Sequence, residues 1–328
     1  MSSYLKLIRL PNLGFIAFIQ YVMRQVVLVP ILQTYGFENE SDKAMIFLLM
    51  AATVFIAAGG YVLNDYFDVK IDAINKPDKQ IVSNTVSRNA AMKFYQLVTA
   101  IGIICGLVLA LWSRSFTMGF TFIVVPGLLW FYSASYKRQF ITGNIIVALL
   151  AALTILVVCI NELAFMQKEF GKLIFETPIP SQFYSWIGGF AIFSFLTTWI
   201  REIIKDMEDE KGDREMECRT MPIKWGVPKT KIFLYGLIGI TVFGLFLVNE
   251  LFIQFPGTLT SRYILFGLTL PFIALIYLIS KSKTAIDYHH ASTLSKVIML
   301  IGVLYCFIFY YLQAKTYEIS LFNLFIIK

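Results

Sequence analysis

The sequence AMIFLLMAATVFIAAGGYVLN, residues 44–64, contains no charged side chain and is followed at once by DYFDVKID, residues 65–72. A helix needs about 20 apolar residues to cross a hydrocarbon core of ~30 Å. The first stretch therefore predicts a membrane-spanning helix. The second predicts that this helix leaves the hydrocarbon near residue 64, because charged side chains are costly inside it.

Seven further runs without Asp, Glu, Lys or Arg have a similar length, 18 to 24 residues. They are 94–113, 115–136, 139–161, 177–200, 232–249, 263–280 and 297–314. Residues 10–33, which are uncharged except for Arg24, predict a ninth span. We therefore expect an all-α, polytopic membrane protein with nine transmembrane helices, in which residues 1–328 form one domain.

The composition excludes several other classes of protein. Hydrophobic residues make up 58% of the chain and charged residues 15%, and the mean hydropathy is +0.70. Soluble proteins carry about 25% charged residues, so a soluble fold, a disordered chain and a disulfide scaffold are excluded. An outer-membrane barrel is excluded as well, because its strands alternate apolar and polar residues over about ten positions.

The basic residues predict the orientation of the chain. Nine spans place the termini on opposite sides, and 20 of the 28 Lys and Arg residues fall on the side of the N-terminus, against 7 on the other. The positive-inside rule makes the first side cytoplasmic. We expect a multi-pass protein of the cell membrane with a cytoplasmic N-terminus. Its net charge of +7 reflects topology and attraction to anionic lipid, without a nucleic-acid partner.

The acidic residues are concentrated in two places. Twelve of the 21 Asp and Glu residues fall in the cytoplasmic loops 65–93 and 201–231, which we expect to cap the bundle. Both loops contain the pattern D-x-x-D-x-x-x-D, preceded in the first by Asn64. The six aspartates are Asp65, Asp68, Asp72, Asp206, Asp209 and Asp213. If helices two and six continue past the membrane surface, this spacing places each set on one helix face.

Such a stripe of carboxylates predicts a metal site, because like charges at this spacing repel one another unless a cation binds them. Mg²⁺ prefers oxygen ligands and typically takes one or two carboxylates together with substrate phosphate oxygens. Ca²⁺ is disfavoured because neither loop has the ligand order of an EF-hand. Basic residues follow both stripes, so the cap offers the two signs of charge that a metal-bound diphosphate requires.

These residues resemble the UbiA superfamily of intramembrane prenyltransferases. The resemblance is carried by NDYFDVKID at 64–72, by REIIKDMEDEKGD at 201–213, and by YSASYKR at 132–138 before Gly143 and Asn144. Within the superfamily, the second stretch is most similar to the digeranylgeranylglyceryl phosphate synthases. Their activity would be Mg²⁺-dependent transfer of a geranylgeranyl group from an allylic diphosphate to geranylgeranylglyceryl phosphate.

The resemblance also implies roles for individual residues. Asn64 and the first three aspartates would hold one Mg²⁺, and the second three aspartates the other, with the prenyl diphosphate between them. The residues implied in substrate binding are Lys79, Lys137, Arg138 and Lys205 for the diphosphate, Asn144 beside them, and Arg9 and Asn12 near the acceptor.

Three other functions remain open at this point. The stretch KPDKQIVSN, residues 76–84, replaces the R-P-x-R-P-I-P-S-G that this branch usually has, so an aromatic acceptor of quinone or chlorophyll biosynthesis is an alternative. Cyclisation of the prenyl chain is a second. A transporter is a remote third, because transporters usually carry acids inside the membrane and the uncharged runs hold none. The oligomeric state is not predicted.

Overall fold

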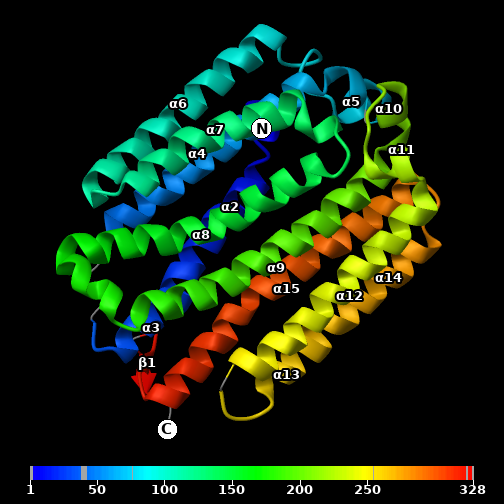
Figure 1. Ribbon diagram of the computed structural model, residues 1–328. Helices are drawn as coiled ribbons and strands as arrows, with labels where there is room; N and C mark the ends of the chain where they lie inside the picture. The colour runs from blue at the N-terminus through cyan, green and yellow to red at the C-terminus, as the bar shows by residue number, and fades with distance from the viewer. Residues whose placement is uncertain (1–2, 38–42, 76, 254, 323, 327–328) are drawn as a thin grey trace.

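The computed structural model describes residues 3–37, 43–75, 77–253, 255–322 and 324–326, and it is a bundle of long helices (Figure 1). Nine helical segments within this part of the chain are long and apolar enough to span a membrane. They are Leu10–Thr34, Lys43–Phe67, Arg88–Ser113, Phe116–Ala134, Thr142–Glu176, Ile179–Glu208, Val227–Phe252, Leu259–Lys281 and Ala285–Tyr317. The predicted all-α architecture with nine spans is confirmed.

Three spans are built from more than one helical element. The first joins α2 (Leu10–Val22), the π-helical turn η1 (Met23–Leu28) and α3 (Val29–Thr34), the fifth joins α8 (Thr142–Phe170) and η4 (Gly171–Glu176), and the eighth joins α13 (Leu259–Arg262), η5 (Tyr263–Thr269) and α14 (Leu270–Lys281). Each of the other spans is one α-helix. In chain order these are α4 (Lys43–Phe67), α6 (Arg88–Ser113), α7 (Phe116–Ala134), α9 (Ile179–Glu208), α12 (Val227–Phe252) and α15 (Ala285–Tyr317).

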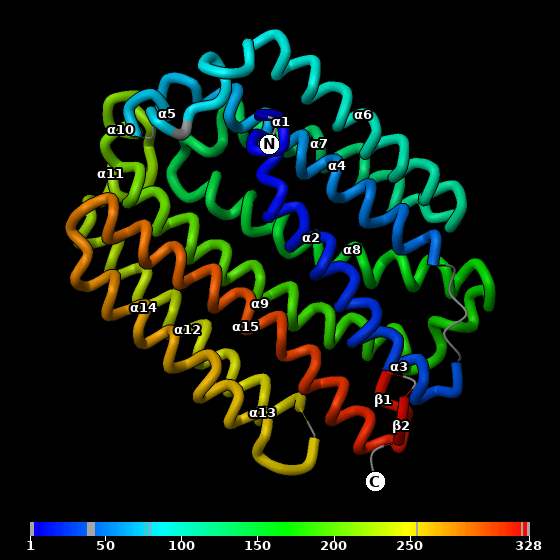
Figure 2. Tube along the Cα trace, turned by 180° about the vertical axis from the view of Figure 1, so that it is seen from behind, coloured from blue at the N-terminus to red at the C-terminus, as the bar shows by residue number. Residues whose placement is uncertain are grey.

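The long helices lie side by side, with α4, α6 and α7 together at one edge, α8, α9 and α15 in the middle, and α12 and α14 at the other edge (Figures 1 and 2). Small residues allow close approach of neighbouring helices. At Gly102 of α6, a Cβ atom would lie 2.9 Å from the Ile56 nitrogen and 3.0 Å from the Ala52 oxygen of α4. The two backbones therefore touch at this point, and any side chain at Gly102 would separate them.

Short elements gather at the two ends of the bundle. At the end that carries the aspartate motifs lie α1 (Ser3–Leu7), α5 (Val69–Asn75), η2 (Pro77–Lys79), η3 (Tyr136–Arg138), α10 (Glu210–Glu215) and α11 (Met221–Trp225). The antiparallel pair β1 (Ser320–Leu321) and β2 (Phe325–Ile326) lies at the opposite end, near the C-terminus (Figure 2). The termini are thus on opposite sides of the bundle, as an odd number of spans requires.

Segments 65–93 and 201–231 are more ordered than the loops that we predicted, because they contain α5, η2, α10 and α11. The expectation of one uninterrupted helical face for each motif is wrong in detail. α4 ends at Phe67 and α5 begins at Val69, so Asp68 lies at a break, and Asp209 lies at the equivalent break between α9 and α10. The backbone compensates locally, since the Asp72 N–H donates to the Asp68 carbonyl at 2.8 Å and the Asp213 N–H to the Asp209 carbonyl at 3.1 Å.

Arg24, the one charged residue in the first predicted span, forms a buried ion pair. Its Nε lies 2.9 Å from Oε2 of Glu162 in α8, and both residues are 2% exposed. Gln20, one turn earlier, is also hydrogen-bonded to neighbouring helices. Its side-chain amide nitrogen donates to the Thr53 hydroxyl at 3.0 Å and to the Thr154 carbonyl at 3.1 Å. A buried charge is tolerated in such a place when it is paired and hydrogen-bonded.

Candidate active site

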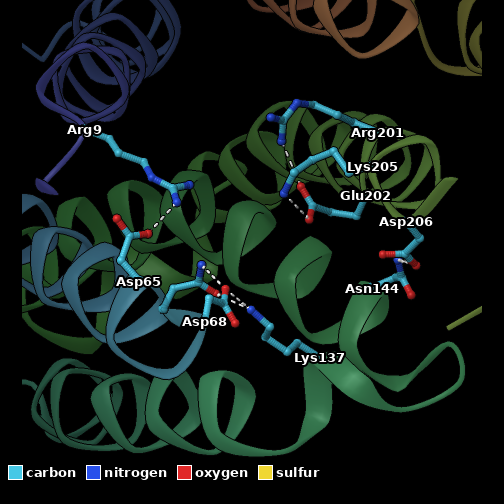
Figure 3. A network of polar contacts seen from close by, with 10 residues as sticks. Arg9, Asp65, Asp68, Lys137, Asn144, Arg201, Glu202, Lys205 and Asp206 are labelled. Atoms are coloured by element: carbon cyan, nitrogen blue, oxygen red, sulfur yellow. Dashed lines mark hydrogen bonds and ion pairs between the residues drawn. The ribbon is translucent and has the colours of Figure 1, made fainter. Parts of the chain in front are cut away.

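The two aspartate motifs face each other at one end of the bundle. Asp65 and Asp68 lie where α4 ends, and Asp206 lies in the last turn of α9, across from them (Figure 3). The turn between α7 and α8 contributes Lys137, and the start of α8 contributes Asn144. Segments far apart in the sequence thus bring acids, a cation and an amide to one place.

Arg9 pairs with the first motif from the beginning of the chain. Its Nη2 lies 2.8 Å from Oδ1 of Asp65, and its guanidinium lies over the Tyr61 ring, 5.1 Å from the centroid. Arg9 has a left-handed backbone with φ of 52° and precedes the first turn of α2, where the Asn12 N–H donates to the Arg9 carbonyl at 2.8 Å. Of the two residues implied in acceptor binding, Arg9 therefore contacts the first motif, and Asn12 lies one turn after Arg9.

Lys137 neutralises the middle of the first motif. Its Nζ pairs with Oδ2 of Asp68 and donates to Oδ1 of Asn64 at 3.2 Å, while Nδ2 of Asn64 donates to the same Asp68 oxygen at 2.9 Å. The other carboxylate oxygen of Asp68 is buried and has no hydrogen-bond partner. An acceptor without a donor is costly when buried, so this oxygen is free to bind a further cation.

Asn144, at the start of α8, forms a hydrogen bond with the second motif. Its Nδ2 donates to Oδ2 of Asp206 at 2.9 Å. The preceding residue, Gly143, has no room for a side chain, because a Cβ atom there would lie 2.6 Å from the Lys137 Cα and 2.7 Å from the Tyr136 oxygen. Gly143 thus lets the start of α8 lie directly on the turn that carries Lys137.

Glu202 lies one turn before Asp206 and accepts from two cations. Arg201 Nη1 lies 2.8 Å from Oε1, and Lys205 Nζ lies 3.0 Å from Oε2. Lys205, which the resemblance implies in diphosphate binding, is therefore held on the inner face of α9 by a carboxylate that belongs to neither D-x-x-D pattern (Figure 3).

Asn75 links the two motifs across the cap. Its Oδ1 accepts from the Gly212 N–H at 2.9 Å, and its Nδ2 donates to the Asp209 carbonyl at 3.1 Å. A Cβ atom on Gly212 would lie 2.5 to 2.7 Å from the Asn75 carboxamide atoms. The residue was not among the predicted site residues, although its position three residues after Asp72 continues the helical spacing of the first motif.

Asp213 ends the second motif in a buried position. Thr220 donates to its Oδ2 at 3.3 Å. Burial, followed by the negative charge of Asp209, raises the pKa of the Asp213 carboxyl from 3.8 to about 6, against the lowering effect of Lys137. A carboxyl in this environment favours a cation beside it, because a cation offsets both the loss of water and the repulsion from Asp209.

The carboxylates do not form finished metal-binding sets. In the part of the chain that the structure describes, no three His, Cys, Asp or Glu groups converge closely enough to hold an ion by themselves. The assignment of three aspartates to each ion stays a prediction, and in this arrangement Arg9, Lys137 and Asn144 engage individual carboxylates. The residues still fit Mg²⁺, which takes one or two carboxylates and completes its octahedron with water and phosphate oxygens. The unpartnered oxygen of Asp68 is such a ligand.

The remaining predicted residues are placed as follows. Asp72 lies in the first turn of α5 and Asp209 at the break before α10. Lys79 ends η2, but its side chain lies outside the described residues. Arg138 follows Lys137 in the chain, yet its side chain lines a separate pocket with Arg219 and Lys224.

The chain was also compared with known proteins. The model of the UbiA prenyltransferase family matches residues 27–288. The chain is 31% identical over 246 residues to digeranylgeranylglyceryl phosphate synthase of Sulfolobus acidocaldarius, covering 74% of this chain and 76% of that one. It is also 31% identical over 230 residues to the synthase of Methanosphaera stadtmanae, covering 70% and 71%.

Solved structures share the fold. One from work on digeranylgeranylglyceryl phosphate synthase in membranes has a TM-score of 0.56 and 25% identity, and the alignment covers 93% of this chain and 98% of that one. A UbiA homologue from Archaeoglobus fulgidus, bound to GPP and Mg²⁺, has a TM-score of 0.53 and 14% identity over 93% and 99% of the two chains. The chain therefore belongs to the UbiA prenyltransferase family and is an enzyme that transfers prenyl groups.

Proposed function

We propose that this enzyme transfers a geranylgeranyl group from geranylgeranyl diphosphate to the free hydroxyl of geranylgeranylglyceryl phosphate, releasing diphosphate. The observation that carries the proposal is the meeting of two aspartate motifs with Lys137 and Lys205 at the end of an apolar bundle. Acids and cations together suit a metal-bound diphosphate, and the bundle suits its hydrocarbon chain. The named relatives are synthases that make digeranylgeranylglyceryl phosphate.

We assign two Mg²⁺ ions to the site, one beside Asn64, Asp65, Asp68 and Asp72 and the other beside Asp206, Asp209 and Asp213. Bound Mg²⁺ supplies charge that stabilises the departing diphosphate. The A. fulgidus homologue, which binds GPP and Mg²⁺, supports this assignment by its fold. The unpartnered oxygen of Asp68 supports it from this chain.

The protein side chains then orient the donor. Lys137 contacts both Asp68 and Asn64, so its ammonium would be positioned to bind a diphosphate oxygen if Asp68 held a metal ion. Lys205 is held by Glu202 on the opposite side. We assign Arg9, which pairs with Asp65, and Asn12 to the acceptor. The bond from the prenyl C1 to the diphosphate oxygen breaks, the glycerol oxygen bonds to C1, and the hydroxyl proton passes to the released diphosphate. The apolar helices exclude water, which would otherwise capture the allylic cation.

We infer that residues 1–328 act as one domain, with the motif-bearing end in the cytoplasm and the helices in the cell membrane. The excess of Lys and Arg on that side, 20 against 7, supports this orientation.

An acceptor screen tests the proposed reaction. Membranes containing the enzyme are incubated with geranylgeranyl diphosphate and Mg²⁺, and products are identified by mass spectrometry with geranylgeranylglyceryl phosphate, hydroxybenzoate, naphthoate or no acceptor. We expect the ether lipid from the first. Product from an aromatic acceptor alone would assign the enzyme to quinone or chlorophyll biosynthesis, and a cyclic hydrocarbon without acceptor would assign it to terpene cyclisation. Normal transfer by Asp68→Ala would refute the assignment of the site to the aspartate motifs.

A further inference from the structure

A pocket of about 920 Å³ lies beside the aspartate motifs. One wall is the turn η3 and the segment that leads into α8, and the other is the chain between α10 and the end of α11. The pocket therefore joins the α7–α8 connection to the α9–α12 connection, which both lie at the cap end of the bundle (Figure 1).

The walls of this pocket are strongly basic. They carry the side chains of Arg138, Arg219 and Lys224 and one carboxylate, Glu217. Among the residues that the structure describes, none of the three cations forms an ion pair. Lys205, by contrast, pairs with Glu202 at 3.0 Å. Three cations that converge without a carboxylate partner create a field that favours an anion.

Two details indicate that this arrangement is built into the fold. The Arg219 N–H donates to the Arg138 carbonyl at 2.8 Å, which ties the two walls together across 81 positions of sequence. Nε of Arg138 is buried and has no hydrogen-bond partner. A buried donor without an acceptor is costly, so a shift of the Arg138 side chain that brings Nε to an anionic oxygen would be favourable. The uncapped start of α8, at Thr142 in the same wall, adds the positive end of a helix dipole.

The pocket lies at the depth at which spanning helices begin and end. Its lining includes Ala134, the last residue of α7, and Thr142, the first residue of α8. Trp225, two residues before α12, is 39% exposed and packs edge-to-face on Phe140 with ring centroids 4.9 Å apart. Tryptophan at such a depth is typical of the membrane–water interface, where lipid phosphates are found.

We propose that this pocket binds the phosphate ester of a membrane lipid, with Arg138, Arg219 and Lys224 as its ligands. The phosphate belongs either to a resident anionic lipid or to the lipid acceptor itself. The second source rests on the proposed function, whereas the first does not. In both cases Arg138 acts in this pocket, while its neighbour Lys137 acts at the aspartate motifs.

Binding is measured first, with the full-length enzyme in detergent and dioctanoyl phosphatidic acid as the probe. Dioctanoyl phosphatidylcholine serves as the zwitterionic comparison, and thermophoresis gives Kd. Each cation near the surface contributes about 1 kcal/mol to attraction of an anionic lipid, so the triple variant Arg138→Gln/Arg219→Gln/Lys224→Gln should bind phosphatidic acid about 100-fold more weakly. The matched control Lys211→Gln/Arg214→Gln/Lys229→Gln removes the same charge from exposed cap positions outside the pocket and should bind as the unmodified enzyme does.

Kinetics then distinguish the two sources. The kinetic variant is Arg219→Gln/Lys224→Gln, which leaves Arg138 in place. If the acceptor supplies the phosphate, this variant raises KM for geranylgeranylglyceryl phosphate and leaves KM for geranylgeranyl diphosphate unchanged. If a resident lipid supplies it, both KM values stay unchanged while phosphatidic acid binding is lost. Equal weakening by the pocket variant and the matched control would overturn the proposal, since it would show general surface attraction. The binding result stands even if the acceptor screen identifies another acceptor, so failures of the two proposals are distinguishable.

Discussion

Replacing Asn75 tests whether its side chain holds the two aspartate motifs together. Its carboxamide makes two hydrogen bonds, to the Gly212 N–H and to the Asp209 carbonyl, and both partners belong to the second motif. Such bonds contribute about 1 kcal/mol each, with an added penalty where a buried group is left unsatisfied. We expect Asn75→Ala to weaken the docking of α10 on α5 by about 2–3 kcal/mol. That corresponds to a roughly 30- to 150-fold change in the docking equilibrium.

Gly212→Ala should break the same contact from the other side. Alanine normally stabilises a helix by about 1 kcal/mol relative to glycine. Here its Cβ would lie 2.5 Å from Nδ2 and 2.7 Å from Oδ1 of Asn75, so it displaces the carboxamide. We therefore expect Gly212→Ala to destabilise the docking of α10, although alanine normally stabilises a helix. We call the two hydrogen bonds of the Asn75 carboxamide the clamp. In Asn75→Ala/Gly212→Ala, the clamp is absent and so is the clash between the alanine Cβ and that carboxamide. We therefore expect the double variant to be no worse than either single variant, with a coupling energy of about 2 kcal/mol.

Hydrogen–deuterium exchange of residues 209–216 in the full-length enzyme measures this docking directly, because the Gly212 amide loses its protecting acceptor. The Mg²⁺ concentration that gives half-maximal prenyl transfer should rise in parallel. Gly127→Ala is the matched control, since a Cβ atom at Gly127 of α7 has no neighbour within 4 Å. Additive effects of the two single variants, or unchanged exchange in Asn75→Ala, would refute the clamp.

Four further outcomes follow from the described contacts. Lys137→Met should raise KM for the prenyl diphosphate at least about tenfold, since a charge-assisted contact is lost; steady-state kinetics with an unchanged KM would contradict its role. Because the pKa of Asp213 is raised to about 6, the Mg²⁺ requirement should increase as pH falls through 6, and Asp213→Asn should weaken this dependence. The same raised pKa means that the metal-free protein loses stability as pH rises from about 4 to 6, visible as a falling Tm. Glu162→Leu leaves Arg24 buried and unpaired and should cost about 3–5 kcal/mol of unfolding free energy, whereas Arg24→Met/Glu162→Leu should recover most of it.

The architecture could be predicted from the sequence because a membrane imposes one dominant constraint, the length of an uncharged run. Span boundaries were less predictable. The last span was predicted from the run 297–314, yet α15 begins at Ala285, where Thr284 and Asp287 form a capping box that ends the preceding loop. A charged residue near the end of a membrane-spanning helix, such as Lys296, ends an uncharged run in the sequence although the helix itself continues.

The site was predictable as a set of motifs and less so as a set of contacts. The repeated spacing of the aspartates identified both halves, but it could not show that Asp65 pairs with Arg9 or that Asp68 pairs with Lys137. These partners lie 56 and 69 positions away, and their meeting depends on how the helices pack. Periodicity within one segment carries no information on this packing, which is also why the partner of Arg24 was not predicted.

The breaks at Asp68 and Asp209 bear on the order in which substrates bind. Asp65 and Asp206 belong to the membrane-embedded helices, whereas Asp72 and Asp213 belong to the short helices beyond the breaks. An ion held by carboxylates on both sides of a break would tie the cap to the bundle. Donor loading would thus immobilise the cap before the acceptor arrives, which favours an ordered kinetic scheme with the diphosphate first.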